Sequence, residues 1–164
     1  PEHQLQRFLS GLKNLDYVTA DISRHDVMVQ MDLTGIQYHD DCFDGMICNH
    51  VLEHIVDDRR AMRELFRVLK PGGWAILQVP ISRRLTETLE DHSIVSEADR
   101  ERVFGQKDHV RIYGADYTER LQGVGFEVKV FKWREVDHLG RFGGDQNRYA
   151  LLQDENLFIA VKPA

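Results

Sequence analysis

The sequence holds only two cysteines, Cys42 and Cys48, and neither belongs to a CxxC pair. This scarcity excludes a disulfide framework and a cysteine-rich zinc site, and it favours a reducing cytoplasm. No apolar run approaches the roughly 20 residues that cross a bilayer, and no signal-peptide pattern opens the sequence, so we predict no membrane partner. The formal net charge of −6 offers no basic excess, which speaks against nucleic-acid binding.

What the sequence does contain is an alternation of strand and helix patterns. Its 164 residues predict one domain, residues 1–164. The alternation predicts an α/β domain with a mostly parallel sheet. The predicted strands cover 16–22, 26–33, 43–50, 74–80, 127–133 and 156–163, and the predicted helices cover 3–13, 51–69 and a third segment that ends near 123. Residues 82–113 and 134–155 interrupt the rhythm, and loops of that length usually serve function or carry short helices.

Two features of the sequence concern the predicted helix over residues 51–69: a pair of acids inside it and a proline-glycine stretch at its end. The Asp57-Asp58 pair is a point where this helix can divide in two. The KPGG stretch at 70–73 is predicted to stop it, because proline cannot continue a helix and the glycines are free to turn. The next strand is therefore expected to begin at Trp74.

Polar residues stand where three predicted strands end. Asp21 and Asp32 close the first two, and Asn49-His50 close the third. Ligands of parallel α/β sheets bind beyond the carboxyl ends of the strands, where an acid can accept hydrogen bonds from ribose. The alternative is that both acids merely cap turns, as aspartate often does. A glycine-rich loop would lie about 20 residues before the ribose acid, and counting back from Asp21 reaches Pro1.

The stretch from His50 to His54 fits the pattern H-x-x-E-H, in which two helical histidines can hold zinc. A zinc site needs a third protein ligand, and the sequence offers no recognisable second half of the motif. An acid near a helix N-terminus also explains Glu53 without a metal. We therefore predict an ordinary helix start and no metal.

His109, Arg111 and Tyr113 alternate as residues on one side of a strand do. We predict that they belong to the substrate region, where they would contact the substrate or help to close the site. The alternative is a surface edge that carries a cation and an aromatic ring.

The stretch FDGMICNHVLEHIVDDRRAMRELFRVLKPGGWAILQVP, Phe43 to Pro80, resembles the central block of class I S-adenosylmethionine-dependent methyltransferases of the type 11 kind. Looser similarity extends over Tyr17 to Leu33 and over YTERLQGVGFEV. The resemblance implies a Rossmann-like three-layer fold. The family's first, central strand and its glycine-rich loop have no counterpart in this chain. A truncated chain, missing upstream residues or a partner chain would explain this difference, so a homo-oligomer that completes the sheet is one expectation.

The resemblance also implies a site. The residues expected to bind the cofactor are Glu2 at the first loop, Asp21, Ile22, Asp32 and Leu33 around the nucleoside, and Asn49 and His50 near the methyl group. Asp21 would accept from ribose hydroxyls, and Asp32 would accept from the adenine amino group. Residues 82–113 and 134–155 would form the acceptor pocket.

The implied activity is methyl transfer from S-adenosylmethionine to a small-molecule acceptor. If the acceptor is a hydroxyl or a thiol, a base helps, and His50, His54 or His109 could serve because imidazole titrates near neutrality. One alternative is a non-catalytic methyltransferase-like domain used for binding or assembly. Another, a nicotinamide-dependent oxidoreductase, is disfavoured because LEH followed by RVLKPGG is not its signature.

Overall fold

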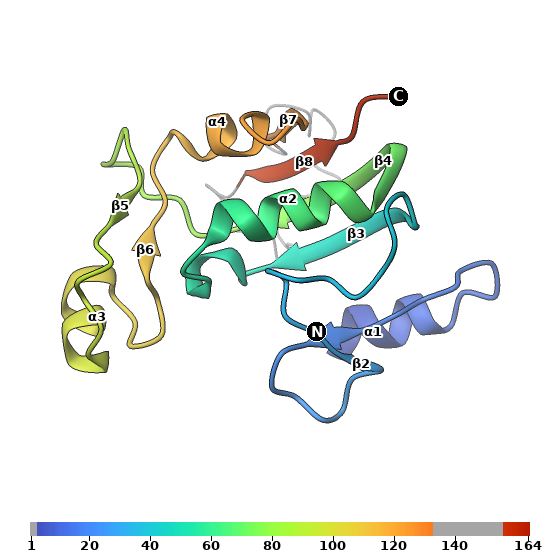
Figure 1. Ribbon diagram of the computed structural model, residues 1–164, viewed down its shortest axis with the longest axis horizontal. Coiled ribbons are helices and arrows are strands. Elements are labelled where there is room, and N and C mark those ends of the chain that lie inside the picture. The colour runs from blue at the N-terminus through green and yellow to red at the C-terminus, as the bar shows by residue number, and fades with distance from the viewer. Residues whose placement is uncertain (1–2, 133–155) are drawn as a thin grey trace, which may run out of the picture.

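The computed structural model describes residues 3–132 and 156–164. Its elements in chain order are α1 (His3–Ser10), β1 (Ala20–Asp21), β2 (Val29–Gln30), β3 (Phe43–Asn49), the 3-10 helix η1 (Leu52–His54), α2 (Asp58–Val68), β4 (Leu69–Gln78), β5 (Leu89–Glu90), α3 (Glu97–Phe104), β6 (Arg111–Ile112), α4 (Tyr117–Gln122), β7 (Glu127–Phe131) and β8 (Leu157–Val161). Figure 1 shows α2 lying across the sheet and α4 beside β7 and β8.

The central sheet has the order β3-β4-β8-β7. β3 and β4 are parallel, while β8 is antiparallel to both β4 and β7. Three strands therefore share one direction and β8 opposes them, which makes the predicted α/β sheet a mixed one. The sheet buries its apolar side chains against α2 and α4, with Met62, Leu65, Leu77 and Leu121 at most 2% exposed. Burial of this kind contributes roughly 1.5–3 kcal/mol per large side chain.

The predicted helix over 51–69 is divided near Asp57, as its paired acids suggested. Asp57 is the N-cap of α2 and its side chain accepts a hydrogen bond from the Arg60 N–H at 2.9 Å. The shorter η1 precedes it. An N-cap acceptor stabilises a helix start by about 1 kcal/mol, so the second acidic position begins a new helix instead of continuing the first.

The KPGG stretch ends the helix but does not form a free turn, which corrects the predicted strand start at Trp74. β4 begins at Leu69, directly after α2, and a register shift separates its pairing of Leu69 with Phe43 from that of Trp74 with Gly45. Gly72 has a φ of 75°. The Gly72 N–H donates to the Lys162 carbonyl and the Lys162 N–H donates to the Gly73 carbonyl, both at 2.9 Å. The sheet therefore absorbs the extra residues as a bulge.

The first two predicted strands are much shorter than expected. β1 and β2 hold two residues each and pair in parallel with one another. Within the described residues they form a sheet of their own, with no hydrogen-bonded strand linking it to the central sheet. Figure 1 shows this small sheet beside α1, below β3. That this chain lacks a central strand of the family stays a prediction.

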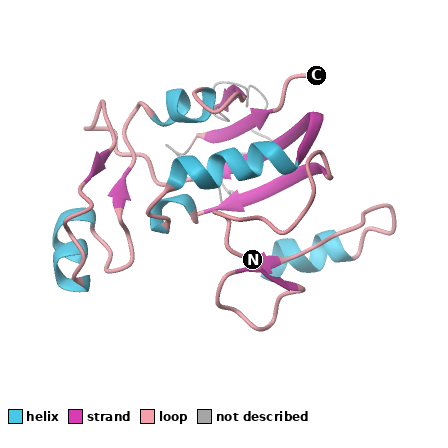
Figure 2. Cartoon of the chain, viewed as in Figure 1, coloured by secondary structure: helices cyan, strands magenta, loops and turns pink. Residues whose placement is uncertain are grey.

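Residues 82–113 carry short elements of their own. β5 pairs with β6 in antiparallel fashion, and α3 lies between them in the chain. Figure 2 shows this group standing to one side of the central sheet. The other predicted insertion, 134–155, lies outside the described residues. Among the helices that are described, no segment has the length and apolar character needed to cross a membrane.

Candidate functional site

Asp21 and Asp32 lie at the same end of the β1–β2 pair, and each organises a turn. Asp21 Oδ1 accepts from the Ser23 and Arg24 N–H groups at 2.9 and 3.0 Å. Asp32 Oδ1 accepts from the Thr34 N–H and hydroxyl, both at 2.8 Å. The Ser23 N–H hydrogen bond, against a smaller effect of burial, holds the pKa of Asp21 below its usual value. The turn-capping role is therefore real, and in both residues it uses Oδ1.

The apolar partners of these acids differ in exposure. Ile22 is 67% exposed, and Leu33 is half-buried and packs against the core. An exposed isoleucine directly after a strand-end acid is free to pack against a ligand ring. Glu2 lies outside the described residues.

Asn49 is the last residue of β3 and pairs in register with Gln78 of β4. The chain then bends at His50, whose N–H donates to the Gln78 carbonyl at 2.8 Å. His50 has a φ of 54°, a left-handed conformation that costs a non-glycine residue about 1–2 kcal/mol. Such strain often accumulates at functional sites. Nothing in the structure tests whether Asn49 meets Asp21 and Asp32 around one ligand, so that convergence stays a prediction.

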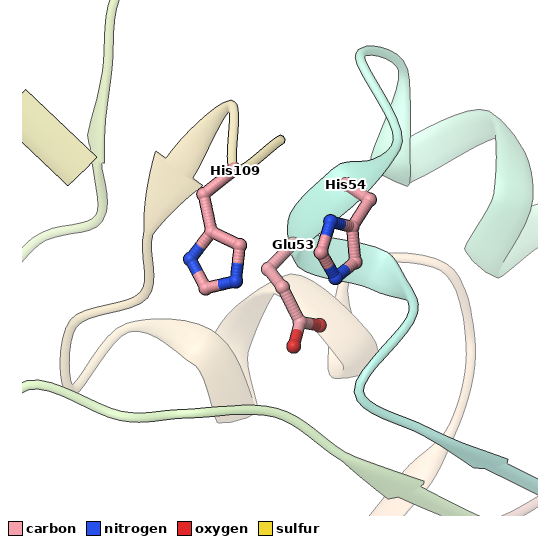
Figure 3. A group of neighbouring side chains, drawn as sticks. All are labelled: Glu53, His54 and His109. Carbon is pink, nitrogen blue, oxygen red and sulfur yellow. The ribbon is translucent and has the colours of Figure 1, made fainter. Parts of the chain in front are cut away.

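Directly after this bend, Glu53, His54 and His109 form a cluster. Their ligand atoms lie within 4.8 Å of one another, and the two imidazole rings meet edge to face with centroids 4.8 Å apart. In Figure 3 the stem of Glu53 starts between the two rings, and its carboxylate lies below them in this view. The Glu53 residue is 2% exposed, and its Oε2 has no hydrogen-bond partner among the described residues. Burial, with the neighbouring His54 charge second, lowers the pKa of His109, so His109 is neutral near pH 7.

The cluster differs from the zinc motif that the sequence suggested. His50 lies outside η1 in a left-handed conformation, and η1 is a 3-10 helix of three residues, so His50 and His54 do not share an α-helical face. The third potential ligand, which the sequence did not reveal, is instead His109. It comes from the loop before β6, which the Val110 N–H ties to the Glu53 carbonyl at 3.0 Å.

The predicted substrate residues Arg111 and Tyr113 turn out to be buried, with 1% and 0% of their surface exposed, so the surface-edge alternative is wrong. Arg111 donates to the carbonyls of Leu52, Ile55 and Val56. The Tyr113 hydroxyl bonds to the Leu52 carbonyl at 3.3 Å. Both side chains therefore hold η1 in place, while a direct contact with substrate stays a prediction.

Three further charged residues complete this network, and the sequence did not indicate this role for any of them. Asp58 Oδ2 accepts from the Tyr113 hydroxyl at 2.8 Å and from Arg120 at 3.0 Å. Glu90 accepts from Arg111 at 3.0 Å and from Arg120 at 2.6 Å. Burial and the Asp58 charge raise the pKa of Tyr113 well above its usual value, so its hydroxyl stays a donor. Because the three charged residues are far apart in the sequence, no local pattern indicates that they meet.

A model of the methyltransferase domain family matches residues 11–77. This range includes all the strand-end residues described above and η1. The match confirms the resemblance to class I methyltransferases, and it adds no information on the acceptor.

Curated relatives share shorter stretches. Demethylmenaquinone methyltransferase of Clavibacter sepedonicus is 37% identical over 62 residues, which cover 34% of this chain and 25% of the relative. The ubiquinone/menaquinone biosynthesis C-methyltransferase UbiE of Vibrio campbellii is 26% identical over 112 residues, which cover 60% of this chain and 43% of the relative. The chain spans less than half the length of these curated relatives.

Solved structures confirm the fold. A methyltransferase of Haloferax volcanii, solved in complex with the Trm112 methyltransferase activator, superposes with a TM-score of 0.53 at 17% identity, covering 82% of this chain and 60% of the other. The (4+2)-cyclase SpnF gives a TM-score of 0.51 at 19% identity, with 82% and 56% covered. A fold shared by proteins with these two descriptions does not by itself determine a reaction.

Proposed function

The chain is a relative of the class I S-adenosylmethionine-dependent methyltransferases, and from this premise we propose that it binds S-adenosylmethionine and transfers its methyl group to a small-molecule acceptor. One observation carries the proposal. The stretch that matches the methyltransferase domain family, residues 11–77, has Asp21, Asp32 and Asn49 at or just beyond the carboxyl ends of three strands. Ligands of α/β sheets bind beyond strand ends of this kind, and the proposal requires the two sheets to bring these ends to one ligand.

The donor set of this edge fits a nucleoside. Asp21 keeps its lowered pKa and therefore its charge, and its Oδ1 is fixed by the turn, which leaves Oδ2 to accept from vicinal ribose hydroxyls. The turn likewise fixes Oδ1 of Asp32, which leaves Oδ2 to accept from the adenine amino group. The exposed Ile22 would cover one face of the adenine ring.

When bound, S-adenosylmethionine supplies a methyl group attached to a positively charged sulfur. Transfer of that group by in-line displacement needs the two reactants held in near-attack geometry and shielded from water. Asn49 and His50, at the bend after β3, are the residues we assign to the methyl end. His109 is buried and neutral, so it can accept a proton from an acceptor hydroxyl or thiol.

The test is calorimetric titration of the full-length protein with S-adenosylmethionine, comparing Asp21→Asn with wild type. Asparagine keeps an oxygen for the turn and loses the charged acceptor, so we expect affinity to fall by about 10- to 100-fold, the equivalent of roughly 1.5–3 kcal/mol for hydrogen bonds to a charged group. Asp26→Asn, on the same loop and paired with Arg24, is the matched control and should bind as wild type does. Equal affinity of Asp21→Asn and wild type would remove the ribose assignment.

A second measurement separates catalysis from binding alone. The protein is incubated with S-adenosylmethionine and a mixture of small-molecule metabolites. It should release S-adenosylhomocysteine faster than the protein does with S-adenosylmethionine and no metabolites. Tight binding of S-adenosylmethionine with no such release across a broad metabolite mixture would favour the non-catalytic alternative instead.

A further inference from the structure

The cluster of Glu53, His54 and His109 has the composition of a metal site. Two imidazoles and one carboxylate form the ligand set of three-ligand sites that keep an open coordination position. The three ligand atoms come within 4.8 Å of one another, and Figure 3 shows the three side chains grouped together. We propose that these residues bind a divalent first-row transition-metal ion such as Zn²⁺ or Mn²⁺.

The burial of Glu53 is the strongest argument that the cluster binds a cation. The residue is 2% exposed, and its Oε2 has no hydrogen-bond partner among the described residues. Its other oxygen, Oε1, lies 3.7 Å from His50 Nδ1, longer than a hydrogen bond. A buried carboxylate oxygen without a hydrogen-bond partner is costly, and buried carboxylates are normally paired or metal-bound. A cation held by the three side chains would compensate it.

Contacts around His54 and around the loop of His109 place both histidines for ligation. His54 Nδ1 lies 3.2 Å from the Asp108 carbonyl oxygen and 3.4 Å from the Asp108 carboxylate. With the proton on Nδ1 donated to Asp108, the lone pair of Nε2 is free for a metal. Histidine ligands typically donate their second N–H to a carbonyl or carboxylate in this way. The Val110 N–H bond to the Glu53 carbonyl fixes the His109 loop against η1.

The cluster must close by more than an ångström to hold the ion. In a tetrahedral site, zinc–ligand bonds of about 2.0–2.2 Å place two ligand atoms roughly 3.3–3.6 Å apart, so the widest separation, now up to 4.8 Å, must shorten by about 1.2–1.5 Å. Rotation of His54, whose side chain is 32% exposed, can supply this. Mg²⁺ prefers oxygen ligands, so this site should discriminate against it.

The use of such a metal rests on the proposed function. The cluster follows the β3 end assigned above to the methyl group, so an acceptor oxygen could occupy the open coordination position. A metal-bound hydroxyl loses its proton more readily. His109 holds the metal in this case and does not act as the base, so that proton leaves to solvent. An oxygen lone pair forms the bond to the methyl carbon, and the electrons of the broken carbon–sulfur bond return to sulfur.

The test uses the full-length protein after treatment with a chelator. Co²⁺ is titrated by visible absorption and Zn²⁺ by calorimetry, and we expect one ion per chain, with much weaker binding of Mg²⁺. Glu53→Gln and His54→Ala should each lower Zn²⁺ affinity at least about 100-fold, because loss of a direct ligand exceeds the 10- to 100-fold cost of an outer-shell change. The matched control is His92→Ala. His92 is an exposed histidine of the segment 82–113 that also holds His109, and the variant should bind Zn²⁺ as wild type does.

Two results would overturn the site. The first is a folded wild type that takes up neither ion, and the second is an unchanged Zn²⁺ affinity in a folded Glu53→Gln or His54→Ala variant. Circular dichroism verifies that each variant is folded, and one folded variant is enough to decide the question. Titration with S-adenosylmethionine in parallel keeps the two proposals apart. Cofactor binding without metal binding would overturn this site alone, and metal binding without cofactor binding would overturn the proposed function alone.

Discussion

The two sides of the proposed site are held in place by different kinds of contact. On the β1–β2 side, the turn bonds of Asp21 and Asp32 reach two or three residues along the chain. On the η1 side, Arg111 bonds to Leu52 across 59 positions and Tyr113 bonds to Asp58 across 55. The first side is organised locally, whereas the second exists only when distant segments have folded together.

Because of this difference, substitutions on the two sides should affect different properties of the protein. A turn that depends on neighbouring residues can form whatever the rest of the chain does, so its acids remain available to a ligand at little cost to folding. A buried network that joins η1, α2, β5, β6 and α4 is part of the folded core, because any removed member leaves other buried polar groups unpaired. Substitutions on the η1 side should therefore lower stability, and those on the β1–β2 side should lower cofactor affinity.

Arg111→Met should give the largest effect. The Arg111 side chain is fully buried and donates to three carbonyls and to Glu90. Methionine fills much of the volume but leaves these acceptors unpaired, so we expect a loss of about 3–5 kcal/mol in the free energy of unfolding, as when a buried ion pair loses one partner. Urea denaturation followed by circular dichroism measures it.

The matched control is Arg102→Met, which removes an arginine that is 75% exposed and pairs with Asp99. Exposed pairs of this kind contribute at most about 1 kcal/mol. Equal losses in the two variants would mean that the η1 network has no special role in stability, and the comparison between the two sides would fail.

The central sheet was predictable because its signals are local. Apolar runs mark β3, β7 and β8, helical spacing and the paired acids mark α2, and all four lie where the sequence places them. The start of β4 was wrong because proline and glycine indicate a turn, and the hydrogen bonds that draw Gly72 and Gly73 into the sheet come from Lys162. β1 and β2 were overestimated because local apolar pattern does not reveal how much of a strand finds a partner.

The candidate site could be predicted only where its signal is local. The positions of Asp21 and Asp32 at strand ends follow from the apolar runs before them, while their cofactor role stays a prediction. The role of Arg111 could not, since its acceptors are backbone carbonyls on η1, which no sequence pattern identifies. The meeting of His109 with Glu53 and His54 was not predicted either, because no sequence pattern links a residue so far along the chain to this motif.

Acidification should weaken the η1 side through Glu90. Burial raises the pKa of Glu90, but hydrogen bonds from Arg120 and Arg111 outweigh this and leave its pKa below the usual 4.5. A lowered folded-state pKa means that Glu90 contributes its full stability above the unfolded-state value near 4.5, and that this contribution is lost as pH falls through the folded-state pKa. Glu90→Gln should cost on the order of 1 kcal/mol at pH 7, and the difference from wild type should shrink toward pH 3.

Urea midpoints measured between pH 7 and pH 3 follow this change. Glu127→Gln on β7, where the side chain is exposed, should track wild type at every pH. A gap between Glu90→Gln and wild type that stays constant over the range would show that the carboxylate charge does not contribute to the network.

Asp32→Asn should have the smallest effect on folding, and it examines the β1–β2 side directly. The amide oxygen can still accept from the Thr34 N–H and hydroxyl, as Oδ1 does now at 2.8 Å, so the free energy of unfolding should change by less than about 0.5 kcal/mol. Affinity for S-adenosylmethionine should nonetheless fall several-fold, because a neutral amide replaces the charged acceptor proposed for the adenine amino group. Urea denaturation should therefore show almost unchanged stability, while calorimetry shows lower affinity for S-adenosylmethionine. A loss of stability above about 1 kcal/mol with unchanged affinity would reverse the assignment, making the Asp32 charge a structural element and leaving the adenine without its proposed acceptor.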